Sequence, residues 1–398
     1  MRKDFVLRGG AALHEHDVVV IGAGPVGSYC AFELARNGLD VLVLEKNLPG
    51  ECQPVCSGVI GTEAFTEFPL PVDSIMSEVR EIVLVSPGGQ KVFYRPDAVQ
   101  AYVVNRTMLD EGLRMLARSN GAEIKEGSTC IGLEVTDRNV HLRVSPGPED
   151  VRAKVVVIAS GYNPALTKMV GLGTVPGFVE GVQAEAEVDE LEQTEVYLGN
   201  TVAPSSFAWL VGLQSGRARI GLTSRGQSRT FLSSFLSNPF VEERVRLTGK
   251  VYKKIIPYGL LKRSFGDRLM VVGEAAGQVK TTTHGGVYYG LIGARIAGET
   301  LLGAWKRQDF STAIFAEYER KWRQLLEPEI AKGIRFRRFF SHLTDGQIEW
   351  FFKMSQKDGI MDLLHKKARF DWHGEFISSL IEHAFFKRYF GRGDEPTA

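Results

Sequence analysis

Residues 17–27 read Asp17-Val-Val-Val-Ile-Gly22-Ala-Gly24-Pro25-Val-Gly27, an apolar run that leads straight into a glycine-rich turn. A short, continuous apolar run is typical of a strand that is buried on both faces. We expect a helix from about Pro25 to residue 37, since Gly38 suits a helix end. Strand, turn and helix in this order predict the opening of a Rossmann-type βαβ unit.

The Gly-x-Gly-x-x-Gly spacing of this turn predicts that the unit binds a dinucleotide. The first glycine allows the tight turn, the second lets the backbone approach a pyrophosphate, and the third lets the helix pack on the strand. The positive N-terminus of the helix then faces the phosphates. The next strand is expected at residues 40–45, and it ends in a carboxylate placed to accept ribose hydroxyls. The expected cofactor-binding residues here are Gly22, Gly24, Pro25, Gly27, Glu45 and Lys46.

The rest of the chain predicts a second sheet of a different kind. Between about 178 and 260, apolar and polar residues alternate in runs separated by turn residues, which is typical of an antiparallel sheet. Further buried strands are expected at 154–159 and 268–273, and helices at 107–119 and 286–303. We therefore expect an α/β fold with three parts: a discontinuous Rossmann-type nucleotide-binding domain (14–70, 100–175 and 262–305), an inserted antiparallel β-sheet substrate domain (71–99 and 176–261) and a helical C-terminal region (306–398).

Composition narrows the class of protein. The chain has 398 residues, of which 44% are hydrophobic and 24% charged, as in an ordinary large globule. A net charge of +1 gives no reason to expect a nucleic-acid partner. The four cysteines all lie in the first third of the chain, which does not suit a secreted disulfide framework. Without a signal-peptide pattern or an apolar run of about 20 residues, we expect a cytoplasmic protein, and contact with a membrane surface stays open.

Two later segments, Ala159-Ser-Gly161 and Gly273-Glu274-Ala-Ala-Gly277, resemble flavoproteins of the para-hydroxybenzoate-hydroxylase type. In those proteins Gly-Asp after the late strand holds the ribitol of FAD, and the glycine-rich segment that follows caps the flavin ring. Here Glu274 replaces that aspartate, and Ser160 replaces the aspartate of an Asp-Gly pair; glutamate still accepts a ribitol hydroxyl but reaches further. The resemblance implies FAD as the cofactor, bound also by Arg106, Gly161, Gly273, Glu274, Gly277, Gly285 and Gly286.

The capping segment suggests how the flavin would be stabilised. A helix that starts at Gly285-Gly286 would aim its free N–H groups at the N1–O2 edge of the flavin, where its positive end favours the anionic reduced ring. His284 either donates a proton or stabilises negative flavin charge there, or it only caps the helix. Arg106, at the head of an earlier helix, contacts the cofactor in the flavoproteins that the chain resembles; a surface helix arginine is the alternative.

A narrower resemblance, over about residues 15–305, is to the geranylgeranyl reductase family. It is carried by Cys56-Ser-Gly58-Val-Ile-Gly61, by Pro204-Ser-Ser-Phe207-Ala-Trp209 with phenylalanine where tyrosine is usual, by Ile256-Pro257-Tyr258-Gly259, and by residues 273–290, where Thr281 replaces a usual proline and His284 a usual glycine. The resemblance implies an FAD-dependent oxidoreductase that saturates C=C bonds of geranylgeranyl (polyprenyl) chains. The chain would be carried by a prenyl diphosphate or an archaeal-type glycerophospholipid, and each bond would receive a hydride from flavin N5 and a proton.

The resemblance also suggests site residues, and each has an ordinary structural alternative. Phe207 and Trp209 share one face of a strand, which suits the wall of a pocket for a long apolar ligand or a plain core. Cys56 by itself would be a small buried residue, and with Cys52 it would form a redox pair. A Cys-x-x-x-Cys pair without neighbouring histidines predicts no metal site. The implied catalytic residues are Cys56, His284 and Tyr288, and the implied substrate-binding residues are Gly58, Pro204, Phe207 and Trp209.

Other functions share these motifs. An FAD-dependent aromatic monooxygenase has the same fold, and so has an electron-transfer flavoprotein, here without an iron–sulfur cluster because no cysteine follows Cys130. A flavin halogenase is disfavoured because the chain has no Trp-x-Trp-x-Ile-Pro motif. No second Gly-x-Gly-x-x-Gly follows a strand, so the expected electron donor is a ferredoxin or transiently bound NAD(P)H. The aromatic and basic tail, residues 335–390, predicts either a packed helical appendix or a helix in a membrane interface.

Overall fold

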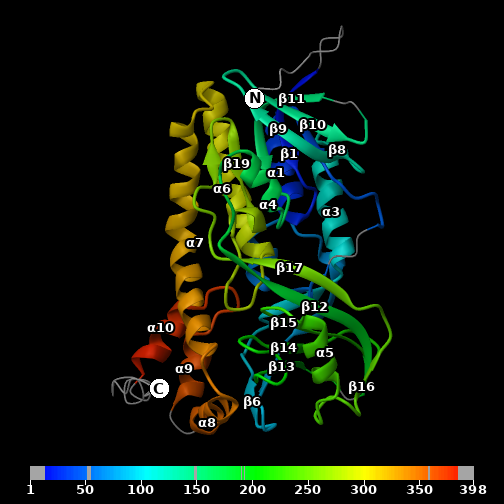
Figure 1. Cartoon of the computed structure of the whole chain (residues 1–398), viewed down its shortest axis with the longest axis vertical. Coiled ribbons are helices and arrows are strands. Elements are labelled where there is room, and N and C mark those ends of the chain that lie inside the picture. Colours follow the sequence, from blue (N-terminus) through cyan, green and yellow to red (C-terminus); the bar gives the residue numbers. More distant parts are fainter. Residues whose placement is uncertain are drawn as a thin grey trace.

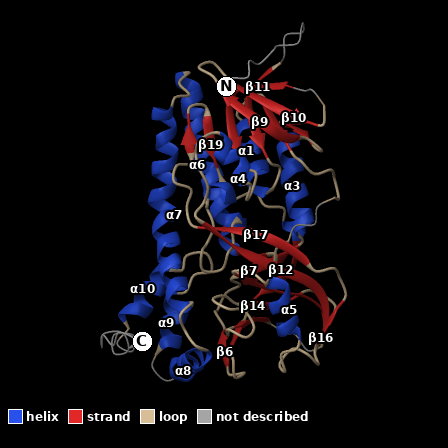
Figure 2. Cartoon of the chain, in the orientation of Figure 1, coloured by secondary structure: helices blue, strands red, loops and turns tan. Residues whose placement is uncertain are grey.

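The structure is a computed structural model that describes residues 14–51, 55–147, 150–189, 191, 193–356 and 359–383. Two large sheets lie at opposite ends of the molecule, and the long helix α7 (Thr312–Phe340) runs past both of them (Figure 1). Helices are concentrated around the upper sheet and along one side, whereas the lower part is mainly strand (Figure 2).

The sheet that carries the glycine turn has eight strands. They are β1 (Glu15–Ile21), β2 (Val41–Leu44), β8 (Glu123–Lys125), β9 (Thr129–Val135), β10 (Val140–Ser145), β11 (Asp150–Ile158), β18 (Phe265–Gly266) and β19 (Leu269–Val271). The order is β18-β19-β11-β1-β2-β8, and the pairs from β19 to β8 are all parallel. The hairpin β9–β10 joins antiparallel at β11.

Strand β1 shows why its sequence is apolar without interruption. Val18 and Val20 face a core formed with α1 (Pro25–Ala35), α3 (Arg106–Ser119) and α6 (Val287–Arg307). Val19 and Ile21 face a second core, which includes β9, β10 and α4 (Pro164–Met169). Because both faces of the strand are covered, all four side chains are buried.

The second sheet is antiparallel at its centre. Its eight strands are β5 (Ile82–Val85), β6 (Lys91–Tyr94), β12 (Gly177–Val188), β13 (Thr194–Tyr197), β14 (Ala208–Gly212), β15 (Arg217–Ser224), β16 (Val245–Leu247) and β17 (Tyr252–Tyr258). The long strand β12 pairs with β15, β16 and β17, and helix α5 (Ser228–Leu236) packs against β12 and β15. A small sheet of β3 (Val59–Gly61), β7 (Ala101–Val104) and β4 (Ile75–Val79) lies in the same part of the chain as α2 (Thr62–Glu67) and the 3-10 turn η1 (Val72–Ser74).

The end of the described chain is helical and packed. After α7 come α8 (Asp345–Ser355), α9 (Ile360–Lys367) and α10 (Gly374–Glu382). Tyr318 and Trp322 of α7 have no exposed surface, and Ile348 and Phe352 of α8 pack with Val92 of β6. The described part of the aromatic tail therefore packs on the globule; residues 384–390 lie outside the described residues. Within the described ranges, no helix has the length and apolar character needed to cross a membrane.

The expected fold class is confirmed. The strand, turn and helix at the start, the helices expected at 107–119 and 286–303, and the antiparallel strands between 178 and 260 are all present, with ends displaced by a few residues. A mainly parallel sheet, a mainly antiparallel sheet and C-terminal helices are present, and the strands of the two sheets alternate along the chain.

Candidate functional site

The glycine turn between β1 and α1 is shaped for a ligand. Gly22 has a φ of +107°, and a side chain there would overlap the carbonyl of Ala159. A side chain at Gly27 would overlap the carbonyl oxygen of Gly22. A Cβ at Gly24, by contrast, would meet no atom within 4 Å. The turn therefore leaves open space beside Gly24, where a pyrophosphate would approach the N-terminus of α1, which Pro25 begins.

Glu45 folds back from the end of β2 onto this turn. Its Oε2 accepts a hydrogen bond from the Ala23 N–H at 2.9 Å, and its Oε1 accepts from the side chain of Asn47 at 2.7 Å. Oε1 also accepts from the Asn47 N–H at 3.0 Å, so both of its lone pairs are used. Oε2 keeps a second lone pair, so Glu45 holds the turn and can still accept a ribose hydroxyl there. Lys46, the next residue, is exposed.

The turn lies against the late glycine segment. Gly273 follows β19 with a φ of +67°, and a side chain there would meet Val26 of α1. A side chain at Gly290, in the first turn of α6, would also overlap Val26. A dinucleotide that binds at the N-terminus of α1 would therefore extend past Val26 towards the N-terminus of α6.

Glu274 lies on that route, in the 3-10 turn η2 (Gly273–Ala276). Its carboxylate forms an ion pair with Lys254 at 2.6 Å, and its Oε2 is 3.6 Å from the position that a Cβ of Gly161 would take. Gly161 and Glu274 thus face each other across a short gap. Gly277 has a different role, since a side chain there would overlap the backbone of Gly259.

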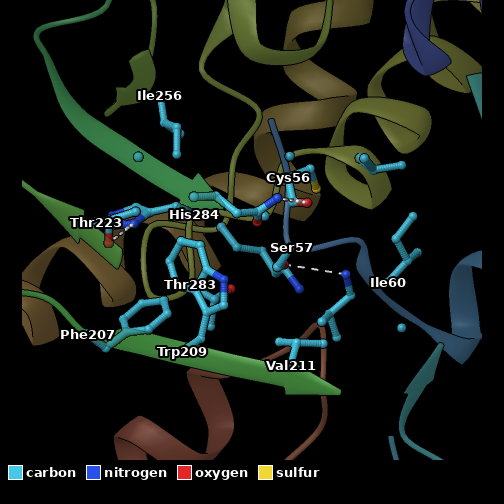
Figure 3. A pocket seen from close by; sticks show the side chains of 18 of the residues that line it. Cys56, Ser57, Ile60, Phe207, Trp209, Val211, Thr223, Ile256, Thr283 and His284 are labelled. Carbon is cyan, nitrogen blue, oxygen red and sulfur yellow. Dashed lines mark hydrogen bonds between the residues drawn. The ribbon is translucent and has the colours of Figure 1, made fainter. Parts of the chain in front are cut away.

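A cavity of about 230 Å³ lies between the antiparallel sheet and the N-terminus of α6. Figure 3 shows one wall formed by Phe207, Trp209 and Val211, with the loop of Cys56 and Ser57 across the space from them. Much of the wall is apolar and comes from β4, β5, β13 and β14. The cavity brings together these expected site residues: Cys56, Arg106, Phe207, Trp209, Glu274, His284, Gly285, Gly286 and Tyr288.

Two of the expected substrate-binding residues are not in the wall. Gly58 lies behind it with a φ of +80°, and a side chain there would overlap the Arg219 guanidinium. Arg219 donates hydrogen bonds to the carbonyls of Ser57 at 2.9 Å and Val104 at 3.0 Å, and so holds the loop in place. Pro204 precedes both Phe207 and β14, which begins at Ala208, and it does not line the cavity. Of the two aromatic residues, only Trp209 therefore lies within the strand. Gly58 therefore shapes the backbone behind the wall.

The thiol of Cys56 lies beside a buried cation. Burial alone would raise the pKa of the Cys56 thiol, but the Arg106 charge, the Gly58 N–H and the Lys254 charge outweigh burial, and the pKa lies below its usual value. Arg106 is the first residue of α3, and its guanidinium also pairs with Asp110 at 3.0 Å. Its side chain is only 11% exposed, so it is not a surface arginine.

His284 is a buried neutral residue and does not cap α6. The N-cap is Gly286, which receives no side-chain hydrogen bond, and the His284 Nδ1 instead contacts the Thr223 hydroxyl at 3.2 Å (Figure 3). Burial, with a smaller contribution from the Arg337 charge, holds the pKa of His284 well below its ordinary value. Its φ of +61° lies in the left-handed region that favours glycine. The ring stacks on Phe207, with centroids 6.2 Å apart.

Tyr288 points its proton at carboxylates. Its hydroxyl donates to Glu67 at 2.7 Å and lies 3.4 Å from Glu63. Burial, followed by the hydrogen bond and charge of Glu67, raises the pKa of Tyr288 above its usual value. The residue lines the cavity, but its proton is held by α2.

Several polar residues of the cavity were not expected from the sequence. Lys254, Lys280 and Asp371 line it. Lys280 belongs to the glycine-rich segment 273–290 but was not expected as a site residue, and Lys254 and Asp371 lie outside the glycine motifs. Gln183 also lines it and donates from Nε2 to the Cys56 carbonyl at 3.0 Å. Among the described residues, four buried polar atoms on the lining side chains have no hydrogen-bond partner: Gln183 Oε1, Trp209 Nε1, His284 Nε2 and Asp371 Oδ2. Unpaired buried polar atoms are rare in proteins, so their gathering at one cavity fits a ligand that has polar groups there.

Comparison with known proteins agrees with this geometry. Residues 16–202 match the pyridine nucleotide-disulphide oxidoreductase family. A digeranylgeranylglycerophospholipid reductase of Methanocaldococcus jannaschii is 29% identical over 349 residues, which cover 84% of this chain and 89% of that protein. The digeranylgeranylglycerophospholipid reductase 2 of Methanothermobacter thermautotrophicus is 31% identical over 353 residues, 84% of this chain and 90% of that protein.

Solved structures share the fold. A geranylgeranyl bacteriochlorophyll reductase-like protein of Thermoplasma acidophilum superposes with a TM-score of 0.84 at 22% identity, covering 96% of this chain and 99% of that one. A flavin-dependent brominase superposes with a TM-score of 0.73 at 19% identity, covering 95% of this chain and 100% of that one. The 31% identity to the Methanothermobacter thermautotrophicus reductase covers 90% of that protein and shows the family of this chain. The protein is an oxidoreductase of the digeranylgeranylglycerophospholipid reductase family.

Proposed function

We propose that the protein is an FAD-dependent reductase that saturates the C=C bonds of geranylgeranyl chains, carried by a prenyl diphosphate or an archaeal-type glycerophospholipid. The observation that carries the proposal is the apolar cavity, which adjoins the N-terminus of α6 and the end of the dinucleotide route. A long hydrocarbon would lie against Phe207, Trp209 and Val211. The relatives that are named as prenyl-lipid reductases support the same substrate class.

The residues present fit FAD. The open space at Gly24 suits the pyrophosphate, Glu45 the adenosine ribose, and the gap between Gly161 and Glu274 the ribitol. The isoalloxazine ring would reach the cavity beside Gly285 and Gly286, where the first N–H groups of α6 lack partners within the helix. When bound and reduced, FAD supplies a hydride from flavin N5 to one carbon of the alkene.

The walls of the cavity exclude water from the reacting bond. Val79, Ile82, Val196 and Val211 present hydrocarbon to the space. An apolar wall binds the prenyl chain by burial, at about 25 cal/mol per Å² of apolar surface. It also strengthens each charge that faces the reacting bond, because the effective dielectric constant is low.

Cys56 is the residue we propose as the proton donor. An acid donates best when its pKa lies near the working pH, and the Arg106 charge brings the thiol in that direction despite burial. Tyr288 is a weaker acid than an ordinary tyrosine because its pKa is raised. His284 stays neutral, so it can position a group by hydrogen bonding but carries no imidazolium proton to donate. Arg106 and Lys254 then stabilise the thiolate that remains.

We also propose the electron donor, the cellular location and the division of the chain into domains. The electron donor to the flavin is a ferredoxin or transiently bound NAD(P)H. The protein acts in the cytoplasm at a membrane surface, where such lipids are accessible. The division into an FAD domain (14–70, 100–175 and 262–305), a substrate domain (71–99 and 176–261) and a helical region (306–398) serves as the working map for variants.

An anaerobic turnover tests the function. The purified protein is reduced with dithionite, a geranylgeranyl glycerophospholipid is added, and the flavin band and the lipid mass are followed together. We expect the flavin to reoxidise as the lipid gains hydrogens in steps of two. A bound flavin beside an unchanged lipid would contradict the reductase and would favour an oxygen-dependent or an electron-transfer role instead.

A further inference from the structure

A C-terminal segment closes one side of the cavity. The segment of residues 369–374, here called the strap, connects α9 to α10, and its residues Phe370 and Asp371 line the cavity. Hydrogen bonds hold it on several sides: Arg369 and Trp372 bond to Glu63, His373 to Thr282, and the Gly374 N–H to Glu329. The Tyr289 hydroxyl donates to the Asp371 carbonyl at 2.9 Å. The strap is therefore a fixed part of the wall.

Within this wall, Lys280 and Asp371 form a buried ion pair. The Lys280 ammonium donates to Asp371 Oδ1, and the two side chains are 7% and 2% exposed. The same ammonium lies 3.4 Å from the Phe370 carbonyl oxygen and 4.7 Å from the centre of its ring. A buried ion pair gains little stability over a hydrocarbon pair of the same size, so its presence in a cavity wall suggests a task there.

The pair has a direction. The Lys280 Nζ lies 3.5 Å from the position that a Cβ of Gly285 would take, at the N-terminus of α6. On the other side, Asp371 Oδ2 has no hydrogen-bond partner among the described residues and lies against Gly61, where a side chain would overlap it. The positive end of the pair thus faces the same space as the N–H groups of α6, and its negative end faces β3.

We propose that Lys280, positioned by Asp371, sets the reduction potential of the flavin by stabilising the negative charge of the reduced ring. The proposal rests on the proposed function, which brings the ring to Gly285 and Gly286. The positive charge of the Lys280 ammonium adds to the partial positive charge at the N-terminus of α6. The low dielectric constant of the buried site strengthens the effect of both charges on the ring. Asp371 limits the effect, because it is the counter-charge that also holds the ammonium in place. Among the described residues, the other two cations that line the cavity form ion pairs elsewhere in its wall: Arg106 pairs with Asp110 of α3, and Lys254 pairs with Glu274 of η2.

Two substitutions that should shift the midpoint potential of the bound flavin in opposite directions test this role. Lys280→Met removes the cation and should lower the midpoint potential of the bound flavin. Asp371→Asn leaves the cation without its counter-charge and should raise that potential. We expect each shift to be at least tenfold in the two-electron equilibrium, which is about 30 mV. The potential is measured on the FAD-bound protein by anaerobic titration against a reference dye, without any substrate.

Controls separate this role from a structural one. Lys280→Met leaves a buried carboxylate unpaired, so the double variant K280M/D371N is measured as well and should lie between the two single variants. Lys253→Met removes an exposed lysine of β17 that pairs with Glu180, and should leave the potential unchanged. Bound flavin with equal or same-sign shifts in both single variants would overturn the role of the pair while leaving the reductase intact. Failure of the wild-type protein to bind FAD would overturn both proposals.

Discussion

The Cys56 thiol and the Arg106 guanidinium form a partly buried pair at the cavity wall, although one belongs to a loop and the other begins a helix. The pair joins the loop before β3 to the N-terminus of α3, and Asp110 holds the arginine from one turn further along. The thiol therefore meets its cation only in the folded chain.

Replacing Cys56 should slow the chemistry and leave the cofactor in place. A positioned general acid contributes roughly a hundredfold to ten-thousandfold to a rate. We expect Cys56→Ala to keep full flavin absorbance and to reduce alkene turnover by a factor in that range, measured by mass spectrometry of the lipid. Cys130→Ala, at a buried cysteine away from the cavity, serves as the control. Unchanged turnover in Cys56→Ala would mean that the cysteine only packs.

Replacing Arg106 should shift the alkaline limb of the pH dependence of kcat. The thiol must be protonated to act as an acid, so the rate falls as the pH rises through its pKa, which the Arg106 charge lowers. In Arg106→Met, burial dominates, the pKa rises, and the alkaline limb of kcat should move to higher pH even though Lys254 and Arg219 remain nearby. Arg118→Met on the outer part of the same helix is the matched control. A limb that stays in place would assign the proton to another group.

Two glycines of the turn should respond in different ways. Alanine at Gly24 meets open space, so the apoprotein should keep its free energy of unfolding while its FAD affinity falls at least tenfold, about 1.4 kcal/mol. Alanine at Gly27 overlaps the Gly22 carbonyl, so that variant should lose stability before any ligand is added. Denaturant unfolding and flavin titration measure the two effects separately. Equal loss of FAD and of stability in Gly24→Ala would contradict an open phosphate site.

Trp209→Ala should discriminate between prenyl chains by length. The indole lies in the cavity wall, and losing the burial of a large apolar side chain costs about 1.5–3 kcal/mol. We expect the KM for a twenty-carbon chain to rise about tenfold or more, and the KM for a short prenyl analogue to change much less. Phe178→Ala removes an exposed aromatic residue of β12 and controls for general effects. Equal losses for both chain lengths would argue against a pocket wall.

The strap should make the free energy of unfolding of the protein depend on pH. Burial and the Lys280 charge lower the pKa of His373 to about 4, while the unfolded chain binds a proton near pH 6.5. Below pH 6.5 the unfolded state therefore binds more protons at His373 than the folded state does. The contribution of His373 to the free energy of unfolding is fully present above that pH. It falls as the pH drops towards 4, by at most about 1.4 kcal/mol per pH unit. His284 acts with the same sign. Tm measured between pH 7 and pH 5 should fall less in His373→Gln than in the wild type, whereas a slope unchanged by that substitution would exclude His373.

Local sequence predicted the first sheet because its signals are short-range. The run at Val18–Ile21, the glycines that follow it and Glu45 lie within one βαβ unit, so spacing alone determines their geometry. The same holds for the N-terminus of α6, where Gly285 and Gly286 precede a long apolar helix. The sequence also predicted that Cys56, Phe207 and Trp209 share a site, but through a resemblance and not through periodicity.

Long-range pairings were beyond such reasoning. Asp371 reaches Lys280 across ninety-one residues, and neither lies in a motif that requires the other. Gln183 and Lys254 come from adjacent strands of a sheet whose register no local signal specifies. A helix cap is one of the roles that the sequence allows for His284, but its ring contacts the distant Thr223 instead, from a backbone with a left-handed φ. Partner choice of this kind depends on tertiary packing, which a local pattern does not contain.

The strap has a consequence for how the protein comes into being. Chains fold from the N-terminus during synthesis, so the dinucleotide turn and both sheets can form while the strap is still untranslated. Until residues 369–374 arrive, Lys280 lacks its carboxylate and the cavity has an open side. A nascent chain on the ribosome would thus already have the groups that hold a nucleotide, but no sealed chamber for a lipid. The order of translation itself would keep the reducing centre incomplete until the strap has been made.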